Sequence, residues 1–154
     1  MSSTVLESAW QAALAAEQQA VFGYGVAGPH LSGAADVGRA RDDEAAHRAL
    51  LTSTSAELAA AGLTPAAPPD DYPALHPVAN GVAARRLAVR LEQDCASAWR
   101  YLFAALAQGG PVAAPTGLRD TAQSNLTASA VRAVRWRMAA GESSATVPFP
   151  GIGS

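Results

Sequence analysis

A glutamate and a histidine lie three residues apart in the stretch RARDDEAAHRALL, which covers residues 39–51. If this stretch is helical, Glu44 and His47 project from one face of the helix. Carboxylate oxygen and imidazole nitrogen both bind divalent metal ions, so the two side chains could hold one ion together. The pair is therefore a candidate part of a metal centre, and its meaning depends on the ligands that other segments bring to it.

Two further glutamates occupy positions where a helix would be apolar. In the helix predicted for residues 3–27, Glu17 lies in the middle of a stripe of large apolar residues spaced four and three apart. In the helix predicted for residues 80–108, Glu92 lies in a similar stripe. Glu44 and His47 occupy the centre of the corresponding stripe in the segment 35–61. Three of the six glutamates in the chain are thus predicted to face a common interior.

Ionised carboxylates in an apolar interior cost much free energy unless they are paired or bound to a metal. Glu17 precedes Gly28 by about eleven residues, and Glu44 follows Ala35 by about nine, so the two should lie at the same height in an antiparallel helix pair. We therefore expect one buried cluster. Its candidate metal ligands are Glu17, Glu44, His47 and Glu92.

Glycine and proline divide the chain into four helical segments. The predicted helices cover residues 3–27, 35–61, 80–108 and 116–140, and each is followed by a glycine or proline that ends it. No stretch shows the alternation of apolar and polar residues that is typical of an amphipathic strand. The sequence therefore predicts an all-α fold, with a helical domain over residues 1–141 and an extended tail over residues 142–154.

The connections between these segments predict the topology. Short loops join the first helix to the second and the third to the fourth, so each pair should form an antiparallel hairpin. The middle connection, residues 63–80, is 18 residues long and rich in proline. A helix of ~27 residues is ~40 Å long, and 18 extended residues reach ~60 Å. This connection can therefore run back along the bundle, as one long crossover between the second and third helices.

The order of these residues resembles the ferritin-like superfamily, in which two helices each supply a glutamate and two others each supply Glu-x-x-His. Glu17, the Glu44-x-x-His47 pair and Glu92 match the first three parts of that pattern. The stretches LAAEQQAVFGYG, DDEAAHRALL and AVRAVRWRMAAGESSATVPFPG look more narrowly like the small ferritin-like family known as domain of unknown function 4439. This resemblance implies an antiparallel ferritin-like four-helix bundle and brings no established activity.

The fourth helix departs from the ferritin-like pattern. Its Glu-x-x-His should lie near residues 129–133, level with Glu92, but Ser129 stands in place of the glutamate and Arg132 in place of the histidine. A cation there would repel a metal and attract carboxylates. A complete two-metal centre, and the di-iron oxidase activity that depends on one, is therefore not expected.

Composition restricts the remaining possibilities. The formal net charge of −2 provides no overall field that would attract nucleic acid. Cys95 is the single cysteine, so the chain cannot form an internal disulfide, and we expect this residue to be a small buried hydrophobe. The N-terminus lacks the pattern of a signal peptide, and no apolar run is long enough to span a membrane. We therefore expect a cytoplasmic protein with no membrane or nucleic-acid partner.

Two functions of different classes remain open. In the first, the protein is a non-catalytic bundle whose polar centre is closed by Arg132 pairing with Glu92 and Glu17, and it acts by association with itself or with another protein. A homodimer is expected, because four leucines lie off the central stripes: Leu50, Leu87, Leu91 and Leu102. In the second, one iron, manganese or zinc ion is held by Glu17, Glu44 and His47, with or without Glu92, and supports redox or hydrolytic chemistry.

Overall fold

The structure is a computed structural model that describes residues 2–108, 114–144 and 146. Its helices are α1 (Ser2–Ala27), α2 (Ala34–Ala60), α3 (Gly81–Ala107) and α4 (Leu118–Ala139), with short 3₁₀ turns η1 (Gly28–His30) and η2 (Pro73–Leu75). Within these described residues there is no strand, and none of the helices is long and apolar enough to cross a membrane. The all-α prediction is confirmed, and each long helix begins and ends within two residues of its predicted position.

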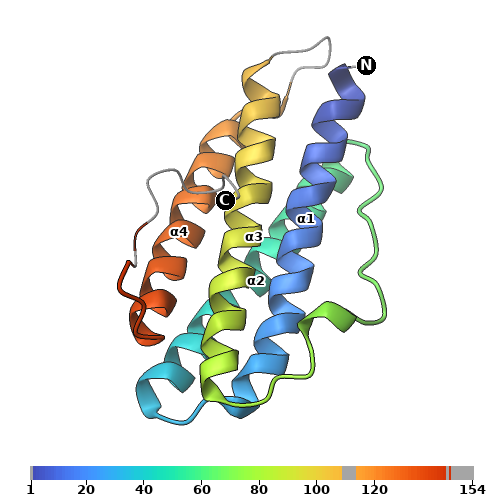
Figure 1. Cartoon of the computed structure of the whole chain (residues 1–154). Coiled ribbons are helices and arrows are strands. Elements are labelled where there is room, and N and C mark those ends of the chain that lie inside the picture. Colours follow the sequence, from blue (N-terminus) through green and yellow to red (C-terminus); the bar gives the residue numbers. More distant parts are fainter. Residues whose placement is uncertain (1, 109–113, 145, 147–154) are drawn as a thin grey trace.

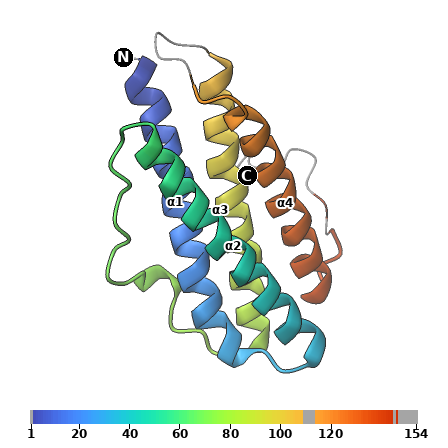
Figure 2. The same cartoon turned by 180° about the vertical axis from the view of Figure 1, so that it is seen from behind.

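The long helices form an antiparallel bundle (Figure 1). α1 packs against α2 and α3, and α3 also packs against α4. Seen from behind in Figure 2, α2 runs diagonally in front of α1 and α3. α2 and α3 run in the same direction, because the segment between them returns the chain to the end of the bundle at which α2 began.

The crossover between α2 and α3 lies along α1 and is fastened to it by two glutamines. The side chain of Gln11 donates to the carbonyl of Thr64 at 2.8 Å and accepts from the backbone N–H of Ala66 at 3.0 Å. Gln18 donates to the carbonyl of Ala66 at 2.8 Å. Leu75 and Val78 are buried farther along the crossover. The prediction of one long crossover is therefore confirmed, and the backbone groups of Thr64 and Ala66 have partners on α1.

The residues that the sequence offers as helix caps and stops have the expected conformations in the structure. The side chain of Asn80 accepts a hydrogen bond from the backbone N–H of Ala83 at 2.9 Å and so caps the start of α3. Gly62 and Gly141 follow α2 and α4 with φ values of 78° and 75°, a left-handed conformation that glycine adopts without strain. The extended tail predicted for residues 142–154 lies mostly outside the described residues.

Two apolar clusters fill the ends of the bundle, and a buried polar layer lies between them. One cluster contains Trp10, Leu14 and Leu102, and the other contains Leu31 and Leu75. Because apolar packing closes the bundle on both sides of the polar layer, water has little access to the charged groups within it.

α1 and α3 approach each other closely just beside this polar layer. A Cβ atom built on Gly23 would lie 2.5 Å from Cδ1 of Leu91, so the contact requires glycine on α1. The next residue, Tyr24, is 2% exposed and points into the polar layer. Glycine at position 23 thus lets α3 come near enough for its side chains to meet that of Tyr24.

Candidate functional site

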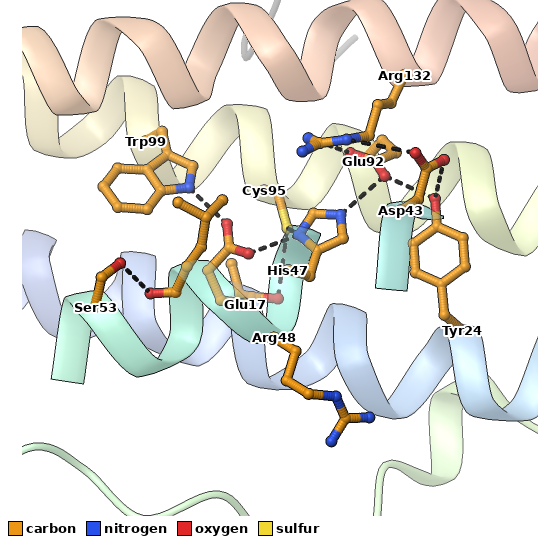
Figure 3. A network of polar contacts seen from close by, with 12 residues as sticks. Glu17, Tyr24, Asp43, His47, Arg48, Ser53, Glu92, Cys95, Trp99 and Arg132 are labelled. Carbon is orange, nitrogen blue, oxygen red and sulfur yellow. Dashed lines mark hydrogen bonds and ion pairs between the residues drawn. The ribbon is translucent and has the colours of Figure 1, made fainter. Parts of the chain in front are cut away.

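His47 on α2 lies at the centre of the polar layer and joins three helices (Figure 3). Its Nδ1 atom is 2.6 Å from Oε2 of Glu17 on α1, and its Nε2 atom is 2.9 Å from Oε1 of Glu92 on α3. All three residues have an exposed fraction of 0%. The structure thus brings together Glu17, His47 and Glu92, three of the four candidate metal ligands, around one imidazole ring.

Aromatic side chains donate further hydrogen bonds to the two glutamates. Trp99 Nε1 donates to the second oxygen of Glu17 at 2.6 Å, and the hydroxyl of Tyr24 donates to Oε1 of Glu92 at 2.7 Å. Tyr24 also stacks on the His47 ring, with ring centroids 5.7 Å apart. Large aromatic residues in the apolar stripes therefore act as hydrogen-bond donors as well as packing groups.

Glu44 does not belong to this cluster, contrary to the prediction from the apolar stripe of α2. Its side chain is 31% exposed and pairs with Arg48 on the outer surface of α2. Asp43 faces the interior in its place, is 7% exposed, and accepts a hydrogen bond from Trp136 Nε1 at 2.9 Å. Asp43 lies four residues before His47 and Glu44 three, so the spacing alone allows either residue to share the side of α2 that carries His47.

Arg132 on α4 closes the cluster from the side opposite α1 (Figure 3). Its Nε atom lies 3.6 Å from Oδ1 of Asp43, and one terminal nitrogen lies 3.7 Å from Oε2 of Glu92. The sequence predicted Glu92 and Glu17 as its partners, whereas the structure pairs it with Asp43 and Glu92. Its side chain is only 12% exposed. A guanidinium group therefore lies among carboxylates at the end of the cluster nearest α4.

Hydrogen bonding between α3 and α4 is incomplete. Ser129, which stands where the ferritin-like pattern predicts a second glutamate, has an exposed fraction of 0%. Within the described part of the chain, its hydroxyl has no hydrogen-bond partner, and neither does Oε2 of Glu92 or the terminal nitrogen of Arg132 beside it. The ion pair at 3.7 Å is thus the closest polar contact that the structure records for this oxygen of Glu92.

The electrostatic environment favours a protonated His47. Burial lowers the pKa of its imidazole, but the hydrogen bonds to Glu17 and Glu92 and the charges of both carboxylates outweigh that effect and raise the pKa to about 9. At neutral pH both ring nitrogens therefore carry a proton and donate to a carboxylate. His47 then acts as a buried cation that pairs with two anions.

Asp43 and Tyr24 hold their protons more strongly than usual. Burial and the nearby charge of Glu92 raise the pKa of the Asp43 carboxyl. Burial, followed by the charges of Glu92 and Asp43, raises the pKa of Tyr24 well above its usual value. Three carboxylates thus face two cations in this cluster.

A group of possible metal ligands shares Glu17 and His47 with the ionic cluster and adds Cys95. Glu17, His47 and Cys95 are fully buried and each offers one possible metal-binding atom, all within 4.8 Å of one another. The thiol of Cys95 lies 4.0 Å from Nδ1 of His47. Cys95 is buried as expected, but it touches the polar cluster, which its position three residues after Glu92 on α3 indicates. These three side chains could hold a metal ion.

Comparison with known proteins places the chain in a family. The family model described as Domain of unknown function (DUF4439) matches residues 9–154. The crystal structure of a conserved hypothetical protein, Rv2844, from Mycobacterium tuberculosis is similar, with 30% sequence identity and a TM-score of 0.77 over 88% of this chain and 97% of that chain. No curated protein matches the sequence. The chain therefore belongs to the family described as Domain of unknown function (DUF4439).

Proposed function

We propose that the protein is a ferritin-like helical bundle in which a buried ionic cluster stands in place of a two-metal centre, and that it acts by association with itself or with another protein. The observation that supports this proposal most strongly is the pair of cations among the carboxylates. His47 bridges Glu17 and Glu92, and Arg132 lies beside Asp43 and Glu92. These contacts compensate the buried carboxylates without a metal ion.

The contacts of Arg132 also argue against catalysis by a two-metal centre. A two-metal centre needs ligands from all four helices, and α4 contributes Ser129 and Arg132 at the matching positions. A positive guanidinium in the place of a second metal disfavours binding of a cation there. Oxygen activation by two irons therefore has no support in this arrangement, and a non-catalytic role follows as the simplest function.

Thermal melting of the purified protein tests whether a metal stabilises the fold. If protons and Arg132 balance the charges, a chelator should leave the melting temperature unchanged, because no ligand that stabilises the folded state is removed. Elemental analysis of protein purified without an affinity tag provides the second measurement. A stoichiometric metal in the untreated protein, lost in the His47→Ala variant, would contradict the proposal.

Self-association is the form of association that we propose. Leu87, Leu91 and Leu102, which suggested a dimer in the sequence, are 5%, 1% and 0% exposed and belong to a wide core face instead. The support now comes from α4, where Val131 and Met138 are 43% and 67% exposed. They lie seven residues apart and therefore share one face of the helix. Two exposed apolar side chains on one face can bury themselves against a second copy of the chain.

Light scattering at micromolar concentration should give twice the 15.6 kDa mass of one chain. A variant that combines Val131→Asp and Met138→Asp should give the mass of one chain, because two buried charges would face each other across the interface. Val82→Asp is the matched control: Val82 is 47% exposed near the start of α3, outside the proposed interface, and this variant should remain dimeric. A monomeric wild type would contradict the dimer.

A second candidate function is the binding of a single divalent metal ion. The specific observation in its favour is the convergence of Glu17, His47 and Cys95. Glu44 cannot take part, because it pairs with Arg48 on the outer surface. Glu92 contacts the other ring nitrogen of His47 and therefore does not share this position. A metalloprotein of this kind would bind its ion between α1, α2 and α3.

A further inference from the structure

We infer that Glu17, His47 and Cys95 form a binding site for added zinc(II), in which Cys95 is a thiolate ligand. This inference rests on the single-metal alternative described above and narrows it to one ion and one ligand set. It gives Cys95 a role in metal binding. Without that role, Cys95 would only pack in the apolar core beside α3.

The donor atoms favour zinc over the harder metals. Glu17 offers a carboxylate oxygen, His47 the Nδ1 atom of its imidazole, and Cys95 a sulfur, each from a different helix. Their donor atoms already lie within 4.8 Å of one another, with 2.6 Å between the oxygen and nitrogen and 4.0 Å between the nitrogen and sulfur. Mixed nitrogen, oxygen and sulfur ligands are typical of zinc, whereas manganese(II) and magnesium prefer oxygen.

Groups that would orient these ligands are already in place. Metal-bound histidine usually donates its other ring N–H to a carboxylate, and Nε2 of His47 lies 2.9 Å from Oε1 of Glu92. The oxygen of Glu17 that does not face His47 accepts from Trp99 at 2.6 Å. The imidazole and one carboxylate of the metal-free cluster thus point toward one common position, and their 2.6 Å contact would have to open to admit a metal.

Metal binding would leave the Arg132 ion pairs in place. Zinc coordinates an unprotonated imidazole nitrogen and a thiolate, so any proton on Nδ1 of His47 and the proton of the Cys95 thiol are released on binding. Arg132 contacts Asp43 and Glu92, and none of these three residues belongs to the proposed ligand set.

Cobalt(II) is the probe for this site, because it takes the place of zinc and reports on its ligands by absorption. Bound to a thiolate, cobalt gives an intense sulfur-to-metal charge-transfer band in the near ultraviolet. Cys95 is the single cysteine of the chain, so such a band can come from no other residue. We expect the full-length wild type to show the band on titration with cobalt, and zinc to displace the cobalt and abolish it.

Three variants sharpen the test. Cys95→Ser should lose the band and bind zinc at least about tenfold more weakly, because loss of a ligand costs at least as much as loss of a supporting contact. Trp99→Phe should keep the band but weaken binding about tenfold, since it removes only the donor to Glu17. Glu44→Gln, at the predicted ligand that lies outside the cluster, should match the wild type.

The outcomes separate this inference from the candidate function on which it rests. If cobalt binds the wild type in a His47-dependent way without a charge-transfer band, a single-metal site exists but its thiolate ligand does not, and the inference is wrong. If neither cobalt nor zinc binds the wild type, both the inference and the single-metal alternative are wrong. The wild-type spectrum decides between them even if Cys95→Ser does not fold.

Discussion

Replacing His47 with alanine is expected to lower the free energy of unfolding by about 3 to 5 kcal/mol, because it leaves buried carboxylates without their cation. The imidazole has an exposed fraction of 0% and contacts Glu17 at 2.6 Å and Glu92 at 2.9 Å. Removing it also opens a cavity between α1, α2 and α3, which adds to the loss. Urea denaturation followed by circular dichroism measures the change.

A second histidine provides the matched control. His76 pairs with Asp71 at 2.8 Å, a distance similar to those of His47, but the side chains are 40% and 51% exposed. His76→Ala should therefore cost less than about 1 kcal/mol, as is usual for ion pairs in water. Equal losses in the two variants would show that the buried cluster contributes no more than a surface pair, and His47 would then not be the cation that holds it together.

Replacing Arg132 with alanine is expected to destabilise the fold by about 3 kcal/mol, near the lower end of the range for breaking a buried ion pair. Its contacts at 3.6 Å to Asp43 and 3.7 Å to Glu92 are longer than those of His47, and its side chain is 12% exposed. Without the guanidinium, Asp43 and Glu92 would repel each other in the interior. The same denaturation experiment measures this loss.

Two controls separate the charge of Arg132 from its volume. Arg132→Lys keeps the positive charge and should recover part of the stability, although lysine lacks the planar guanidinium group. Arg41→Ala removes an exposed arginine of α2, away from the proposed α4 interface, and should change the free energy by no more than about 0.5 kcal/mol. If Arg132→Ala were as mild as Arg41→Ala, the proposed replacement of a metal by Arg132 would not hold.

Much of the fold could be predicted from local signals. Glycines and prolines end the helices because they act within a turn or two of the chain, and Gly62 and Gly141 adopt the left-handed conformation expected of helix stops. The long crossover follows from length and proline content. Glu17, His47 and Glu92 could be predicted to meet, because each lies in the middle of an apolar stripe and all three lie at one height.

The choice between Asp43 and Glu44 could not be made from spacing alone. With about 100° of rotation per residue, Asp43 lies about 40° from His47 around α2 and Glu44 about 60° on the other side. Both fit an alternation of three and four residues. Thr54 and Leu58 are 1% and 0% exposed and, with His47, mark the inward direction, to which Asp43 lies closer. A rotation of α2 by a few tens of degrees decides which carboxylate is buried.

Sequence patterns also could not identify the hydrogen-bond donors of the cluster. Tyr24 and Trp136 occupy core positions where aromatic residues normally pack. A helical pattern does not show which acceptor a tyrosine hydroxyl or an indole N–H will reach. Tyr24 lies 2.7 Å from Glu92, which is 68 residues away in the chain, and Trp136 lies 2.9 Å from Asp43, which is 93 residues away. Contacts of that separation depend on how α1, α2, α3 and α4 pack together.

The pH dependence of stability follows from the raised pKa of His47. A group whose pKa is higher in the folded state stabilises the fold fully below its unfolded value of 6.5, and this contribution is lost as the pH rises through about 9. A difference of this size corresponds to about 3 kcal/mol. The titratable groups that face His47 are Glu17 and Tyr24 on α1, Glu92 and Cys95 on α3, and Asp43 on its own helix.

The protonation state of His47 tests the central claim most directly. Nitrogen-15 NMR of the imidazole in metal-free protein, recorded from pH 6 to pH 10, measures whether each ring nitrogen carries a proton. The ionic cluster predicts an imidazolium with both nitrogens protonated at pH 7.5, which loses its proton near pH 9. A neutral His47 at pH 7.5, with one unprotonated nitrogen, would contradict the claim that a buried cation holds the cluster together.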